Sequence, residues 1–357
     1  MKAIKLISSS LFLAGLTALA LQSAYAADDD ELSPQFKSGD DVSLTPGHPN
    51  HFAAFAPESP EMLARMPEID PETGLHVSEV KPGLFYVTEG VYQSAFLVTD
   101  EGVIVFDAPP SFAHKLPDLI AEHAPGMTIR YLVYSHGHTD HIGGAGVFAG
   151  IKGLEVVAHE KVAESIAKSG RPGLLKPTRK YDEQYDVSLG GQIVEFTPAS
   201  FHAEDADTII YLPDRKFVIA VDTITPGEVP FMNFGATSDV GAYMTFFDRV
   251  LDYDFDHILS GHVSVLGNRD DVVMARDYAF DVRETAGRSM ATFFNRFNSV
   301  FKAFEYKNAN LAYRTAIESV RRDCAKEIID SWSGKLSVVD VWADSHCQTV
   351  ILYNIMH

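Results

Sequence analysis

Cysteine is almost absent from this sequence. Only Cys324 and Cys347 occur in 357 residues, and both lie near the C-terminus. No CxxC pair is present, which argues against a metal site built from cysteine thiolates. We predict one disulfide that closes the tail, and two free buried thiols are the alternative.

Positive charge is also scarce. The chain has 29 Lys and Arg residues against 49 Asp and Glu residues, which gives a formal net charge of -20. Phosphate backbones repel a strongly acidic protein, so we expect no nucleic-acid partner. Solubility is the simplest role for this charge, and it says little about any pocket.

Long apolar runs are missing as well. The longest covers residues 6–21, but serines 8 to 10 interrupt it, leaving roughly a dozen apolar residues where a membrane-spanning helix needs about 20. Two lysines precede the run, and Ala24-Tyr25-Ala26 has the small-x-small form of a signal-peptidase site. Residues 1–26 are therefore predicted to be a signal peptide. We expect an exported protein, periplasmic or secreted, with no stable membrane insertion after processing.

Composition divides the remaining chain into three parts. Residues 27–70 are rich in Asp, Pro and Ser and have few periodic apolar positions, which is typical of an arm. Residues 71–268 alternate β-type runs with helical patterns, which predicts an α/β (α+β) domain of stacked sheets with helices outside. Residues 269–357 are mostly helical and are predicted to form a C-terminal extension.

Aromatic residues recur at three- and four-residue steps in that extension, from Phe293 to Phe304. This spacing places an apolar stripe along one face of a helix. We expect the stripe to pack on the domain of residues 71–268 as part of the core. A groove for a lipid or acyl tail, or the face of a homodimer, is the alternative.

The most informative stretch is His136-Gly-His-Thr-Asp-His141, which holds three imidazoles and one carboxylate in six positions. A short apolar run precedes it and glycines follow it, so it is predicted to lie on a strand-to-helix loop. Residues two apart on extended backbone point the same way, so His136 and His138 can bind one ion. Asp140 and His141, past the turn, can face a second ion.

Three further donors stand at predicted strand ends. His202, Asp222 and His262 each follow an apolar run of strand character. Sheet enzymes gather functional groups at such positions, so we predict that these donors complete two coordination spheres. Four other histidines are not part of this pattern of donors and are interpreted as ordinary surface or core residues: His114, His123, His159 and His257.

With HxHxDH followed by His, Asp and His at wide intervals, the chain resembles the metallo-β-lactamase-fold superfamily over roughly residues 76–285. The resemblance implies an αββα sandwich, here with the C-terminal helical extension, and two divalent metal ions, expected to be Zn²⁺. It also assigns the ligands: the first ion to His136, His138 and His202, the second to Asp140, His141 and His262, and both to a bridging Asp222.

A bridging aspartate is typical of glyoxalase II and of lactonases in this superfamily, although those lactonases have Tyr where this chain has Thr225. The resemblance therefore implies hydrolysis of a small-molecule ester, thioester or lactone by a metal-bound hydroxide. Asp140 is the candidate catalytic residue, because it could orient the nucleophile or carry a proton. A β-lactamase and a mononuclear iron persulfide dioxygenase are the alternatives.

Asp107 closes a predicted strand and resembles a family position that supports the metal loop from behind. A buried carboxylate must be hydrogen-bonded, so such a supporting role is physically sensible. An exposed turn residue before two prolines is the alternative reading of Asp107.

Two loops are candidates for binding the substrate. The loop after Asp222 is predicted to stand at the rim of the site, where Phe231, Met232 and Phe234 would offer apolar contact. The same side chains could instead plug the edge of the sandwich. The glycine- and proline-rich residues 170–177 form the second loop, which offers Arg171 or Lys176 to an anionic group.

Overall fold

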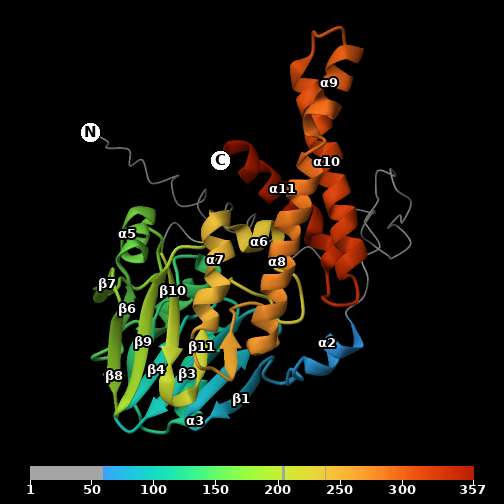
Figure 1. The fold of residues 1–357 in the computed structure, drawn as a ribbon. Helices are drawn as coiled ribbons and strands as arrows, with labels where there is room; N and C mark the ends of the chain where they lie inside the picture. The colour runs from blue at the N-terminus through green and yellow to red at the C-terminus, as the bar shows by residue number, and fades with distance from the viewer. Residues whose placement is uncertain (1–58, 203–205, 238) are drawn as a thin grey trace, which may run out of the picture. The chain divides into compact units, whose positions relative to one another are not determined.

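A computed structural model describes residues 59–202, 206–237 and 239–357, and Figure 1 shows how its elements are arranged. The predicted signal peptide and most of the predicted arm lie outside the described residues. Within the described part of the arm, Pro60–Arg65 forms the short helix α2. Across the described residues, every helix is too short or too polar to span a lipid bilayer.

One mixed sheet has seven strands in the order β1-β2-β3-β4-β5-β6-β7. Strands β1 to β4 pair antiparallel, whereas β4 to β7 pair parallel. The strands are β1 (His76–Lys81), β2 (Leu84–Thr88), β3 (Gln93–Thr99), β4 (Gly102–Phe106), β5 (Ile129–Val133), β6 (Glu155–His159) and β7 (Arg179–Tyr181).

A second sheet has five strands in the order β12-β11-β10-β9-β8. Only its β11 and β12 pair parallel, and the remaining neighbours pair antiparallel. The strands are β8 (Tyr185–Leu189), β9 (Gln192–Ala199), β10 (Asp207–Leu212), β11 (Phe217–Ile219) and β12 (His257–Leu259).

The helices of the described residues lie between and after these strands. The earlier ones are α3 (Leu116–His123), α4 (Thr139–Ile142), α5 (Glu160–Ser169), α6 (Met232–Ala236) and α7 (Val240–Leu251), with 3-10 turns at Ala113–Lys115, Ala145–Phe148 and Pro213–Arg215. The C-terminal extension comprises α8 (Arg269–Met290), α9 (Phe293–Ala303), α10 (Ala309–Trp332) and α11 (Val339–Met356).

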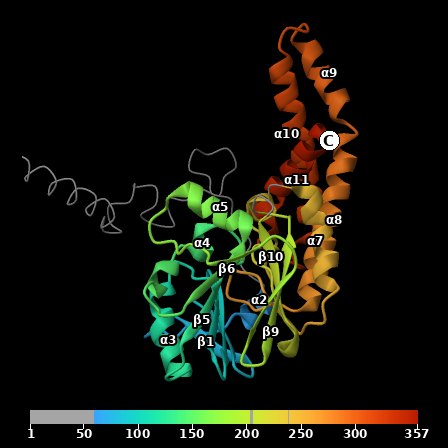
Figure 2. The same ribbon diagram turned by 90° about the vertical axis from the view of Figure 1, so that its left-hand side faces the viewer.

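The two sheets pack face to face around one apolar layer (Figure 2). Side chains of the first sheet, such as Ile104 and Val133, meet side chains of the second, such as Phe196 and Ile219. Successive side chains of a strand point to opposite faces, so the outer face of the first sheet packs on α3, α4 and α5. The outer face of the second shares one apolar cluster with α7 and α8, and the same cluster continues into α10 and α11. The layers confirm the predicted αββα sandwich with C-terminal helices.

A capping box of side-chain and backbone hydrogen bonds marks the start of α8, the first helix of the extension. The Asn268 side chain accepts from the backbone of Asp271, and the Asp271 carboxylate accepts from the backbone N–H of Asn268, which forms a capping box. The Asp271 carboxylate also accepts hydrogen bonds from two guanidinium nitrogens of Arg65 in α2, at 2.8 and 2.7 Å. One carboxylate therefore starts the extension and ties the chain before β1 to it.

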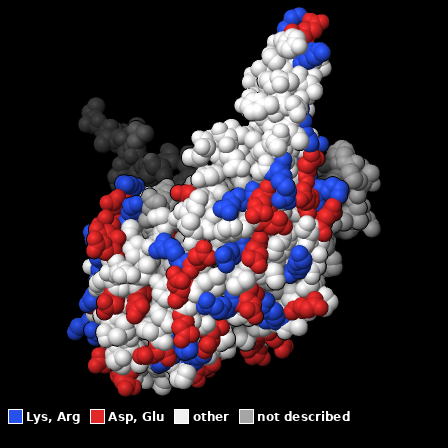
Figure 3. All heavy atoms as spheres, viewed as in Figure 1, with Lys and Arg blue, Asp and Glu red and all other residues white. Residues whose placement is uncertain are grey.

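The aromatic stripe of α9 does not pack on the sandwich, so that prediction is wrong. Phe293 and Phe297 pack on Tyr313 of α10, at ring-centroid distances of 5.3 and 5.4 Å. Phe294 is 69% exposed and Phe304 is 47% exposed. The reason is the length of α8: its 22 residues rise about 33 Å, which carries α9 beyond the sheets (Figure 1). On the face drawn in Figure 3, this part of the extension is largely free of charged side chains.

The helices α10 and α11 are joined covalently. Cys324 and Cys347 form the predicted disulfide, and both residues are fully buried. The disulfide fixes α11 to α10, the longest helix of the extension. It thereby holds α11 near the loop that follows β11.

His346 of α11 links the extension to that loop. Its Nε2 lies 3.1 Å from the carbonyl oxygen of Phe231, and its Nδ1 lies 2.7 Å from the Tyr278 hydroxyl of α8. A carbonyl only accepts, so Nε2 carries the proton and Nδ1 accepts from Tyr278. The ring also stacks on Phe234 at 4.4 Å. Burial lowers the pKa of His346 to about 4, which keeps the ring neutral at neutral pH.

We predict that His346 makes the fold acid-sensitive. Its ordinary pKa of 6.5 applies in the unfolded chain, so between pH 6.5 and 4 the unfolded state binds more protons. The contribution of His346 to the free energy of unfolding is therefore constant above pH 6.5. It falls as the pH approaches 4, by about 3 kcal/mol in total. Urea unfolding from pH 7 to pH 4.5, with a chelator present, measures the loss.

The matched variant is His346→Gln, because its side-chain amide can bond but cannot titrate. The free energy of unfolding of the wild type should fall more steeply with acid than that of the variant. Parallel pH profiles for the two proteins would show that His346 is not the group responsible.

Candidate metal centre

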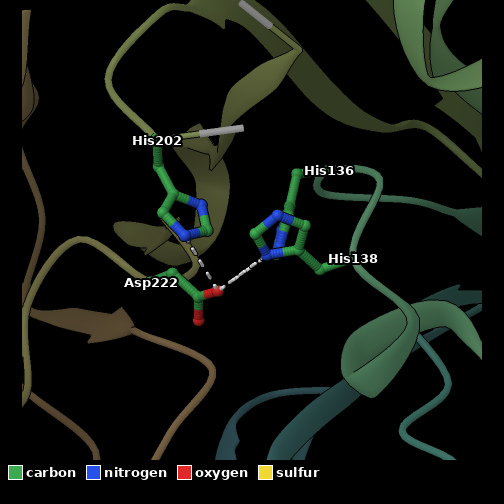
Figure 4. A group of neighbouring side chains, drawn as sticks. All are labelled: His136, His138, His202 and Asp222. Atoms are coloured by element: carbon green, nitrogen blue, oxygen red, sulfur yellow. Dashed lines mark ion pairs between the residues drawn. The ribbon is translucent and has the colours of Figure 1, made fainter. Parts of the chain in front are cut away.

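All seven predicted donors meet at one edge of the sandwich, where strands of both sheets end. The hexapeptide follows β5, and its His138 immediately precedes α4. His202 follows β9, Asp222 follows β11 and His262 follows β12. The donor atoms form two groups, and Figure 4 shows the first. The groups are His136, His138, His202 and Asp222, and then Asp140, His141 and His262.

The carboxylate of Asp222 lies between the two groups and turns one oxygen toward each. Its Oδ2 lies 3.3 Å from Nε2 of His136 and 3.8 Å from Nε2 of His202. Its Oδ1 lies 3.0 Å from Nε2 of His141 and 3.1 Å from Nε2 of His262. This is the arrangement that a bridging ligand requires, because each oxygen can serve a different cation.

Asp140 belongs to the second group and is the most accessible carboxylate in the centre. Its Oδ2 lies 3.5 Å from Nε2 of His141 and 3.7 Å from Nε2 of His262. The side chain is 40% exposed, against 6% for Asp222. Asp140 can therefore bind a cation with one oxygen and still reach water.

Asp107 lies directly behind the loop of the hexapeptide. Its Oδ1 accepts the backbone N–H of Ser135 at 2.8 Å, and its Oδ2 accepts the Ser135 hydroxyl at 2.6 Å. That hydroxyl lies 3.0 Å from Nδ1 of His136. Because its proton goes to Asp107, it accepts from Nδ1, which leaves the Nε2 lone pair of His136 facing Asp222. The buried, hydrogen-bonded position agrees with the predicted support and differs from an exposed turn.

Asp207 supports His202 in a similar way and was missed by the sequence analysis. Its Oδ2 accepts the backbone N–H groups of Phe201 and His202, at 3.2 and 2.8 Å. Its Oδ1 lies 3.5 Å from Nδ1 of His202. The ring is thereby turned so that Nε2 faces Asp222. Asp207 is the first residue of β10 and lies five residues after His202. This short spacing was the feature of the sequence that could have pointed to it.

Gln93 holds the loop that carries His262, and it too was missed. Its side-chain oxygen accepts the backbone N–H groups of Ser260 and Gly261, both at 3.1 Å. Its Nε2 donates to the carbonyl oxygens of Val263 and Val265, at 2.9 and 3.0 Å. One buried amide of β3 in the first sheet therefore fixes a loop of the second sheet.

The charges in the centre favour a cation. Burial raises the pKa of Asp107 to about 6 and lowers the pKa of His136 to about 4. Burial also opposes protonation of His141, but Asp222, Asp140 and Asp107 outweigh it and raise the pKa of His141 to about 9. The Asp222 carboxyl has a pKa well below its ordinary value, because burial is outweighed by His141 and the neighbouring imidazoles.

These residues fit divalent metal ions. Nε2 of His136 and Oδ1 of Asp222 are buried and have no hydrogen-bond partner among the described residues. Nε2 of His141 and Nε2 of His262 lie 3.1 Å apart, close enough for both nitrogens to bind one cation in place of a shared proton. Imidazoles with carboxylates are the donors that zinc prefers. The chemistry and direction of the donors therefore suit two cations.

The remaining predicted residues are placed as follows. His114, His123, His159 and His257 belong to neither group of donors. Of the three rim residues, only Phe231 lines the cavity beside the centre. Met232 is 41% exposed outside that lining, and Phe234 is fully buried against Tyr243 and His346. Phe234 therefore differs from the expectation, because left-handed backbone from Asn233 to Gly235 turns it into the core.

Residues 88–262, which include all seven donors, match the family model described as the metallo-beta-lactamase superfamily. The 2,4-dinitroanisole O-demethylase subunit alpha of Nocardioides sp. (strain JS1661) is 28% identical over 209 residues, which are 57% of this chain and 62% of that protein. The chain thus spans less than two thirds of this curated relative.

Two solved structures share the fold. A metallo-beta-lactamase from Pontibacter korlensis superposes with a TM-score of 0.50 at 19% identity, over 57% of this chain and 97% of the other. The stereoselective inverting sec-alkylsulfatase Pisa1 from Pseudomonas sp. superposes with a TM-score of 0.53 at 18% identity, over 78% of this chain and 50% of the other. At these identities the likeness concerns the fold alone.

We predict that Gly261→Ala disturbs the second group of donors. Gly261 has φ +89°, and a Cβ there would overlap Val221 and lie 3.0 Å from Cε1 of His141. The added methyl group should displace His141 and cost about 1–3 kcal/mol through strain and overpacking. We expect fewer than two bound metal ions per chain by elemental analysis, with a lower unfolding midpoint.

Gly287→Ala is the matched control. Gly287 lies within α8, and a Cβ there would meet no atom within 4 Å. This change should keep full metal content and stabilise the helix by up to about 1 kcal/mol. If Gly261→Ala also bound two ions per chain, His141 would not be held as described.

Proposed function

Because this chain belongs to the metallo-beta-lactamase superfamily, we propose that it is a metal-dependent hydrolase of a small ester, thioester or lactone. The proposal assigns two divalent ions, with zinc as the expected metal, to the seven clustered donors. The observation that carries it is the position of Asp222, whose two oxygens face two separate sets of imidazoles.

The donor sets support a catalytic rather than a purely structural site. Each set offers three side chains besides Asp222, and His138 and Asp140 of these sets also line open cavities. A catalytic ion needs such access, because one coordination position must remain for water or substrate. Two ions held in this way polarise a carbonyl oxygen and lower the pKa of water, which is the chemistry they supply when bound.

The chain's own residues would act around that chemistry. Asp222 holds the two donor sets in register, and Asp107 and Asp207 fix the rings of His136 and His202. Asp140 would orient the attacking water with its accessible oxygen and carry a proton to the leaving group. In the overall reaction, water adds to the carbonyl carbon, the C–O or C–S bond breaks, and the leaving alcohol or thiol gains the proton.

The second donor set separates this proposal from a persulfide dioxygenase. A single iron needs one set of donors, whereas this centre has a second set of Asp140, His141 and His262. β-Lactam hydrolysis would use the same reaction class on an amide. These two activities are therefore included as outcomes of the test.

We expect full activity to require two ions and Asp222. The metal-free protein should be inactive against a panel of esters, thioesters, lactones, β-lactams and an aryl methyl ether, and zinc should restore turnover of at least one class. Asp222→Asn should bind fewer ions and lose more than about 100-fold in kcat/KM, because its amide cannot bridge two cations as a carboxylate does.

Asp214→Asn is the control, since Asp214 is an exposed residue of the turn between β10 and β11. It should keep both the metal content and the activity of the wild type. One iron per chain with oxygen consumption would replace the proposal with a dioxygenase. Full activity without any metal would contradict the proposal outright.

A further inference from the structure

Two cavities open on the candidate metal centre and share His138 and Asp140. One has a volume of about 500 Å³, and we call it the Trp342 cavity. The other has a volume of about 320 Å³, and we call it the Arg171 cavity. Both are in the size range of ligand pockets or close to it. Since the centre lies between them, a substrate bound at the metals can extend in two directions.

The Trp342 cavity has a mainly apolar wall made by three distant parts of the chain. The loop after β11 supplies Ile224, Val229 and Phe231, and Val91 comes from the turn before β3. Trp342 comes from α11, about eighty residues after the last metal donor, and its ring packs on Phe231 at 4.8 Å. Apolar walls of this kind gain free energy by removing alkyl or aryl groups from water.

The apolar wall is held rigidly by contacts between α11 and the loop. Besides the bond of His346 to Phe231, the Ser345 hydroxyl accepts the backbone N–H of Asn233 at 3.1 Å. The Thr349 hydroxyl donates to the Asn233 side chain at 3.0 Å. These polar contacts fix the two elements that carry Phe231 and Trp342, so the cavity keeps its shape without a ligand.

The Arg171 cavity has the opposite character. Its wall carries Arg171 and Lys161, together with the hydroxyl-bearing residues Thr139, Ser165 and Ser169. The Arg171 guanidinium donates to the Thr139 hydroxyl at 3.0 Å, which places it beside the hexapeptide. Among the described residues that line this wall, the metal donor Asp140 is the only acid, whereas the Trp342 cavity also contains Glu228. An anionic group is therefore favoured on the Arg171 side.

We propose that the substrate is an amphiphilic ester, which deepens the proposed function and rests on it. Its alkyl or aryl acyl group occupies the Trp342 cavity, its scissile carbonyl lies at the metals beside His138 and Asp140, and its anionic leaving part occupies the Arg171 cavity. Water adds to the carbonyl, the C–O bond breaks, and the anionic alcohol or phenol leaves with one proton. Trp342 and Phe231 thus set the specificity for the acyl group, and Arg171 sets that for the leaving group.

The acyl side is tested with phenyl esters of unbranched acids from two to ten carbons. For the two-metal wild type, kcat/KM should rise about four-fold for each added methylene until the cavity is full. In Trp342→Ala this dependence should flatten, and Trp342→Phe should restore most of it. Phe294→Ala removes an exposed aromatic side chain of α9 outside the cavity and should leave the profile unchanged.

The leaving-group side is tested with esters of 4-hydroxybenzoate and with their neutral 4-hydroxybenzamide counterparts. The wild type should prefer the carboxylate by at least ten-fold in kcat/KM, mainly through KM. Arg171→Gln should bring this ratio close to one. Lys168→Gln removes the same charge from α5 outside the cavity and should keep the ratio of the wild type.

A binding measurement separates this inference from the proposed function. Unbranched carboxylates, the acyl products, are titrated calorimetrically into the zinc-loaded protein, so the result does not depend on turnover. Affinity that rises with chain length in the wild type but not in Trp342→Ala supports the acyl site even if no ester is hydrolysed. If the affinity of the wild type for these carboxylates does not change with chain length, the acyl site is overturned. If Arg171→Gln keeps the carboxylate-to-amide ratio of kcat/KM that the wild type has, the anionic site is overturned. Metal content and unfolding midpoints confirm that each variant is folded.

Discussion

The buried carboxylate of Asp222 is the constraint on which this site depends. Five imidazoles and a second carboxylate lie around it, and the buried negative charge there demands a compensating positive charge. The raised pKa of His141 expresses the same demand, because three carboxylates nearby favour a positive charge at that position. Divalent metal ions would satisfy the demand, which is why the geometry supports a metal site.

The sandwich meets this constraint by ending strands of both sheets at one edge. Residues held just beyond those ends need unusual backbone, and Asp107, Asp222 and Val263 all have positive φ. Such conformations cost free energy, and surrounding contacts must hold them. Backbone hydrogen bonds to neighbouring segments provide these contacts at all three residues, and Gln93 adds a side-chain bond to Val263. Asp107, Asp207 and Gln93 also bond through their side chains to loops of the site. The candidate metal centre is thus built as much by its supporting side chains as by its donors.

The helical extension shapes a cavity beside the candidate metal centre without supplying a donor. It contributes no donor to the centre, yet α11 places Trp342 in the wall of the larger cavity. The disulfide to α10 and the His346 bonds hold that helix in position. A change in the sequence of α11 would therefore alter the wall of this cavity and leave the seven donors unchanged.

The sequence by itself determined the layered fold, the pairing of the two cysteines and the candidate donors, because these depend on short-range periodicity, on composition and on donor types in a recognisable order. Tertiary structure alone identified Asp207 and Gln93 as further supports and placed Trp342 in a cavity wall. Phe231 and Phe234 stand three residues apart, yet one reaches the cavity and the other the core, since left-handed backbone between them reverses the direction of the side chain. The exposure of α9 follows from how far α8 runs past the sheets. Trp342 contacts Phe231 only because two segments more than a hundred residues apart pack together. No local pattern records such long-range contacts.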